Sequence, residues 1–127
     1  MSADEDRRAL RPKLDLVPAA ATEEKFQNET LRPIMKLQHD LILAIFRHFL
    51  LKRKVKLEQF PADQRFGKIK EMVARDHRLR ELLFGLAMGQ CTAAEMTDCL
   101  EHESDVHRRM TNLVVERLTS VFAPVTK

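Results

Sequence analysis

From Leu31 onward, apolar residues recur at every third or fourth position, which is the period of an amphipathic α-helix. The first run predicts a long helix over residues 31–54. Thr30 is a suitable N-cap, and Pro33 falls in the first turn, where its missing N–H costs little. The inner face of this helix carries Leu31, Ile34, Leu37 or Gln38, Leu41, Ile45 and Phe49.

Two further runs follow Pro61. The first predicts a helix whose inner face carries Phe66, Ile69, Met72 and Val73. The second predicts a helix that begins near Asp76 and ends at Gly89, a residue type that often follows a helix C-terminus. This second helix directs inward Leu79, Leu82, Leu83 and Leu86.

The last third of the chain predicts two more helices. Thr92 and Glu95 have the spacing of a capping box, which opens a short helix that ends near His102. Ser104 then caps the final helix, and Pro124 ends it. The apolar stripe of this final helix consists of Val106, Met110, Leu113, Val114, Leu118, Val121 and Phe122.

Together these runs predict an all-α fold, a compact bundle of about five helices in one domain over residues 22–123. Residues 1–21 lack apolar periodicity, so we expect a flexible N-terminal arm, and residues 124–127 form a short tail. The 127-residue chain is 44% hydrophobic, which is enough to build a core. Three isolated glycines, and no Asn-Gly or Asp-Gly pair, argue against a β-rich fold.

The densest apolar segment is residues 41–51, in which nine of eleven residues are apolar. These residues occupy every side of a helix, and a helix that is apolar all round is buried on all sides. Either this helix is the central one of the bundle, or a second copy of the chain covers one face in a symmetric dimer. The candidate core or self-association residues are Leu41, Ile45, Phe46 and Phe49.

Positive charge is concentrated in residues 47–80, which carry eleven Lys and Arg against four acidic residues. The whole chain has a net charge of only +3. Such a region can meet the phosphates of a nucleic acid or an acidic protein, and the alternative is an ordinary solvated basic face. The candidate patch for an anionic partner is Lys52, Arg53, Lys54, Lys56, Lys68 and Lys70.

The residue types that catalyse reactions or bind metals form no recognised motif. The five histidines show neither Glu-x-x-His nor His-Glu-x-x-His spacing, and there is no Gly-x-Ser-x-Gly elbow or phosphate-binding glycine loop. We therefore expect no catalytic residue, metal or cofactor. Cys91 and Cys99 are expected as buried thiols in a reducing cytosol.

No apolar segment reaches the ~20 residues that a membrane span requires. Arg7 and Arg8 have no apolar stretch behind them, so the N-terminus does not resemble a secretory or twin-arginine signal. We expect no contact with a membrane and a cytoplasmic location.

Residues 26–41 (FQNETLRPIMKLQHDL) and residues 108–118 (RRMTNLVVERL) resemble a group of short bacterial all-helical proteins without an established activity. The resemblance covers about residues 24–120 and implies matching helix lengths. It carries over no catalytic residue, because the group has no assigned active site. Some members carry a glyoxalase label, but glyoxalase folds are β-rich or α/β, and this sequence supports neither scaffold.

The sequence therefore predicts a non-catalytic helical interaction or scaffolding module that self-associates as a homodimer. The alternative function is a weak, mostly sequence-independent nucleic-acid binder that uses the basic residues 47–80. A small helical enzyme, with a pocket assembled from separate helices, ranks third.

Overall fold

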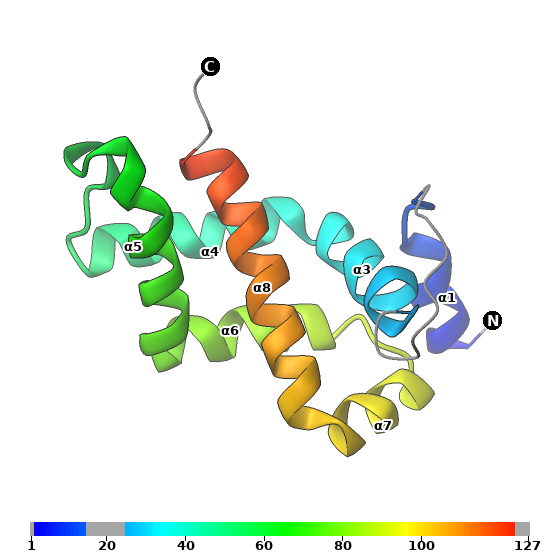
Figure 1. Ribbon diagram of the computed structural model, residues 1–127. Helices are drawn as coiled ribbons and strands as arrows, with labels where there is room; N and C mark the ends of the chain where they lie inside the picture. Colours follow the sequence, from blue (N-terminus) through cyan, green and yellow to red (C-terminus); the bar gives the residue numbers. More distant parts are fainter. Residues whose placement is uncertain (1, 15–24, 124–127) are drawn as a thin grey trace.

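The computed structural model describes residues 2–14 and 25–123, and the elements of these segments are helical (Figure 1). The all-α prediction is confirmed for these residues. Seven α-helices lie within them, two more than expected, because one predicted helix is divided and part of the predicted arm is helical. They are α1 (Ala3–Leu10), α3 (Arg32–Leu37), α4 (His39–Lys52), α5 (Ala62–Arg75), α6 (His77–Met88), α7 (Ala93–Glu101) and α8 (Glu103–Phe122).

Helix α8 crosses in front of α4 and α6, and it also packs against α3, α5 and α7 (Figure 1). Helices α4 and α6 lie side by side and run in opposite directions. Removal of apolar side chains from water stabilises this packing. The core side chains that are at most 2% exposed include Ile34, Ile42, Phe46, Phe49, Ile69, Leu79, Leu83, Met110 and Leu118.

The predicted helix over residues 31–54 is divided at Gln38. The backbone of Gln38 (φ −92°, ψ 9°) leaves the α-helical region, and its buried side chain donates from Nε2 to the Leu86 carbonyl at 3.1 Å. This bond satisfies a carbonyl in the last turn of α6, where helical partners run out. The long helix therefore becomes α3 and α4.

The start of α3 also differs from the prediction. A π-helical turn at Gln27–Leu31 precedes it, in which the Arg32 N–H bonds to the Gln27 carbonyl. Thr30 lies inside this turn, so the prediction that it caps the helix is wrong. Its hydroxyl instead donates to Glu95 Oε2 at 3.3 Å, because a buried carboxylate acceptor lies beside it.

The capping box at the start of α7 is confirmed. The Thr92 N–H donates to Glu95 Oε1 at 2.8 Å, and the Glu95 N–H donates to Thr92 Oγ1 at 3.2 Å. At the start of α6, the Asp76 carboxylate accepts from the Leu79 N–H at 3.2 Å. Both caps satisfy amides that have no partner within their own helix.

Other local predictions are wrong. Helix α8 begins at Glu103, so Ser104 lies inside the helix instead of capping it. Gly89 keeps a right-handed backbone (φ −62°, ψ −16°) and does not adopt the left-handed conformation of a terminating glycine. Pro124 and the predicted tail lie outside the described residues. Four side chains expected in the core are at least one-third exposed, namely Leu41, Phe66, Leu82 and Val121.

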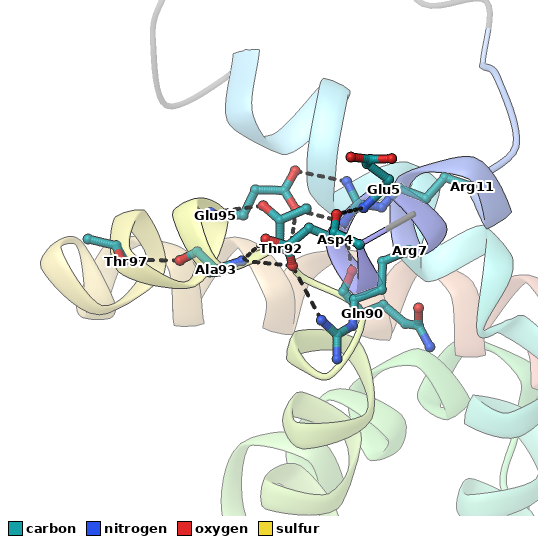
Figure 2. Close-up of polar contacts among 10 residues, drawn as sticks. Asp4, Glu5, Arg7, Arg11, Gln90, Thr92, Ala93, Glu95 and Thr97 are labelled. Atoms are coloured by element: carbon teal, nitrogen blue, oxygen red, sulfur yellow. Dashed lines mark hydrogen bonds and ion pairs between the residues drawn. The ribbon is translucent and has the colours of Figure 1, made fainter.

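The first part of the predicted arm is ordered and contacts α7 (Figure 2). Helix α1 occupies residues that were expected to be flexible. The Asp4 carboxylate accepts from the Ala93 N–H at 3.2 Å, a favourable position for an anion because helix N-termini are partly positive. Arg11 then donates two hydrogen bonds to Glu95. The arm prediction thus fails for residues 3–11, and residues 15–21 lie outside the described residues.

Candidate interaction surfaces

Helix α4 has one buried face and one exposed face. Its buried side chains are Ile42, Leu43, Phe46 and Phe49, and the ring of Phe46 lies 5.1 Å from that of Phe122 on α8. Helix α4 is therefore not covered on all sides within one chain, so the alternative that makes it the central helix of the bundle is wrong. Of the four candidate residues, Phe46 and Phe49 belong to the core. Leu41 is exposed, and Ile45 is partly buried.

We define the α4 outer face as Leu41, Ala44, Ile45, His48 and Leu51. Leu41 is 52% exposed and Leu51 is 82% exposed, while Ile45 is partly buried. The neighbouring helix α6 exposes a further leucine, Leu82, at 47%. Large apolar side chains gathered along one helix are unusual on a free surface and are typical of interaction sites.

Two residues of opposite charge lie along one flank of the α4 outer face. Asp40 and Arg47 are seven residues apart, which places them two turns apart on the same side of the helix. Both are exposed, and neither has a salt bridge among the described residues. The guanidinium of Arg47 lies 5.4 Å from the centre of the Phe122 ring.

The second surface is a concave site of about 610 Å³ where α4, α5 and α6 meet, which we call the basic groove. Val55 and Met72 supply apolar lining, and Met72 is buried. Two acidic residues, Glu71 and Asp76, also line the groove. The basic side chains that line it are Arg53, Lys68, Arg75, His77 and Arg78.

Asp76 and Arg53 connect the ends of two helices within the basic groove. The Arg53 guanidinium donates to both Asp76 oxygens, at 2.8 and 3.3 Å. Hydrogen bonds from Arg53, together with those from the first turn of α6, hold the pKa of Asp76 below its usual range. Asp76 therefore caps α6 and positions Arg53 at the same time.

The turn that follows α4 places Lys54 in a strained conformation. The Val55 N–H bonds to the Leu50 carbonyl at 2.8 Å, and the Lys54 N–H bonds to the Leu51 carbonyl at 3.1 Å. These two bonds form a Schellman motif, in which the residue at the position of Lys54 is usually glycine. Lys54 has φ 57°, the one positive φ of a non-glycine residue in the described segments.

The structure brings together part of the predicted basic patch. Of its six residues, Arg53 and Lys68 line the basic groove, whereas the other four are exposed and do not line it, namely Lys52, Lys54, Lys56 and Lys70. The sequence reasoning counted Arg75 and Arg78 in the basic region 47–80 but left them, and His77, out of the candidate patch. A signal was present, because these residues flank the boundary between two predicted helices, where the end of one helix and the start of the next share a surface.

The two cysteines are free thiols, and the prediction that they are buried is confirmed. Cys91 precedes the cap of α7, and Cys99 lies within that helix. Their thiols are close enough to interact. Hydrogen bonding with Cys99 and burial raise the pKa of the Cys91 thiol. Among the described residues, no group of three His, Cys, Asp or Glu side chains is placed to hold a metal ion.

A smaller cavity of about 150 Å³ lies between α3 and α8. Its charged groups contact each other or neighbouring side chains. Arg32 and Glu116 form a 3.6 Å salt bridge, and Arg117 lies 3.0 Å from His39 Nδ1. Burial lowers the pKa of Arg117. This cavity is smaller than the basic groove, and each of its charged side chains has a charged or polar partner.

In comparisons of the chain with known proteins, no family model, no curated protein and no solved structure matches. The resemblance to short bacterial helical proteins therefore stays a prediction. Within the described segments, no helix combines the length and the apolar composition of a membrane span.

Proposed function

We propose that the protein is a non-catalytic helical interaction module that forms a homodimer through the α4 outer face. The observation that carries this proposal is the exposure of Leu41 and Leu51, at 52% and 82%, on a helix whose opposite face lies in the core. Covering these leucines would remove apolar surface from water, at about 25 cal/mol for each Å² buried.

A second copy of the chain is the partner that the charges favour. Closed two-fold dimers are the commonest oligomers, and they require a surface that complements itself. If two copies of α4 pack antiparallel about a two-fold axis near Ala44, Asp40 of one copy faces Arg47 of the other. The same contact then occurs twice. Ala44 is small, which allows the two helices to approach closely at the crossing.

The expected dimer is weak. With the axis near Ala44, only residues 39–48 of the two α4 helices overlap, so at ~1.5 Å per residue the helical contact is only about 15 Å long and Leu51 lies at its edge. The apolar gain must also offset the loss of translational and rotational freedom. We therefore expect a dissociation constant on the order of 10–100 µM, which makes dimerisation dependent on concentration.

Light scattering across a wide concentration range tests the proposal. The molar mass of the wild type should rise from 14.8 kDa toward twice that value. The double variant L41K/L51K should stay monomeric, because it places four lysines in the interface. The matched control L10K/L100K changes two leucines that are also exposed, at 61% and 60%, but lie on α1 and α7.

The control should dimerise like the wild type. A wild type that stays monomeric at millimolar concentration would contradict the proposal. So would an equal loss of dimer in both double variants, since that result would attribute association to general surface hydrophobicity.

A further inference from the structure

We propose that the basic groove, where Arg53, Lys68, Arg75 and Arg78 converge, binds the phosphate backbone of a double-stranded nucleic acid. This function is separate from self-association, because it uses the turns after α4 and between α5 and α6, not the α4 outer face.

The charge balance of the basic groove leaves two arginines available. Its two carboxylates already have partners: Asp76 is bound by Arg53, and Glu71 lies 3.7 Å from Lys68. Arg75 and Arg78 are exposed and form no salt bridge with the described residues. A guanidinium can donate two parallel hydrogen bonds to a phosphate, so these arginines suit an oxyanion of that geometry.

Lys54 provides an independent argument. Its left-handed backbone (φ 57°) is strained relative to a right-handed one, and glycine would avoid that strain. The chain nevertheless has a lysine there, between Arg53 and Val55, both of which line the basic groove. A strained residue at the edge of a concave site points to a role for its side chain.

The positive charge extends beyond the groove, which favours a polymer over a small phosphate compound. Lys52, at the end of α4, and Lys54 and Lys56, which follow it, are exposed. No phenylalanine lines the groove, and the chain has no tyrosine or tryptophan, so among the described residues His77 is the one aromatic side chain there on which a single-stranded base could stack. Contacts to the backbone of a duplex need no such stacking, and they confer little sequence preference.

Fluorescence anisotropy with a labelled 20-base-pair DNA duplex tests this site. The full chain should bind at low salt, and its affinity should fall steeply as salt rises, because each neutralised phosphate releases counterions. The variant R75Q/R78Q should bind at least tenfold more weakly. It should also reduce the slope of log affinity against log salt by about two, because two arginines no longer neutralise a phosphate each.

The matched control is R8Q/K36Q, which removes the same net charge from two exposed residues. These residues lie on α1 and α3, on the side of the molecule away from α5 (Figure 1). The control should bind nearly as tightly as the wild type. Circular dichroism should show both variants folded, because all four side chains are exposed.

Three outcomes would overturn the inference. The first is no binding at 50 mM salt. The second is an equal loss of affinity in both double variants, which would reduce the effect to net charge. The third is displacement of the duplex by polyglutamate at an equal concentration of charges, which would assign the groove to an acidic protein. None of these depends on dimerisation, which light scattering reports separately.

Discussion

Arg11 and Glu95 form a bidentate ion pair between segments 84 residues apart in the chain (Figure 2). The Arg11 guanidinium donates to the two Glu95 oxygens at 2.8 and 2.6 Å, and it also donates to the Gln90 carbonyl at 2.6 Å. Both side chains are nearly buried, at 8% and 12% exposed. This pair attaches the N-terminal segment to the start of α7.

Glu95 should make the protein sensitive to acid. Burial opposes its charge, but hydrogen bonds from Arg11 and Thr92 outweigh burial and lower its pKa to about 2. Its stabilising effect is therefore complete above the unfolded-state pKa of about 4.3, and it is lost as the pH falls through 2. The loss amounts to up to about 3 kcal/mol of the free energy of unfolding.

Urea unfolding at several pH values measures this effect. At pH 7 the variant E95Q should be less stable than the wild type by about 3 kcal/mol, because Arg11 loses its buried partner. The difference should shrink between pH 4 and 2. The control E101Q changes an exposed glutamate on the same helix and should follow the wild type throughout. A constant difference between E95Q and the wild type across this range would contradict the assignment.

Reactivity of Cys91 should report the attachment of the N-terminal segment. Cys91 is 6% exposed and follows Gln90, whose carbonyl is bound by Arg11. The variant R11Q should detach this segment and speed thiol labelling in the native state at least tenfold, since local opening becomes about 1.4 kcal/mol easier. R8Q, which changes an exposed arginine on α1, is the control. Equal labelling rates in R11Q and R8Q would show that Arg11 does not protect the thiol.

Replacement of Lys54 by glycine should stabilise the protein. Glycine adopts φ 57° without strain, although it also gives the unfolded chain more freedom. We expect a net gain of about 0.5–1 kcal/mol in the free energy of unfolding, measured by urea denaturation. The variant K54A removes the same charge but keeps the strained Cβ, so it should show no gain. A gain of the same size in K54A would attribute the effect to charge.

The sequence predicted those features whose partners are close along the chain. Thr92 and Glu95 of the capping box are three positions apart, and the apolar stripe of α8 follows the helical period, so both can be recognised in a linear sequence. Arg11 and Glu95 are not, because nothing in either segment indicates its distant partner. For the same reason, the bond from Gln38 to Leu86 that accompanies the division of the long helix could not be predicted.

The two candidate surfaces show the same limit. All the apolar residues of the segment 41–51 look alike in sequence, and the packing of α4 against α6 and α8 decides which of them become buried. The basic region was evident from the distribution of charge along the sequence. Its concave form depends on the turn between α5 and α6, which brings Arg75 and Arg78 to the end of α4.

Disulfide trapping at position 44 tests the proposed dimer most directly. Ala44 lies near the expected two-fold axis, so cysteines introduced there face each other across the interface. Under mild oxidation, A44C should form a covalent dimer of twice 14.8 kDa much faster than the control L100C, whose residue is also exposed. Equal rates of cross-linking in A44C and L100C would contradict the proposal that α4 pairs with its own copy.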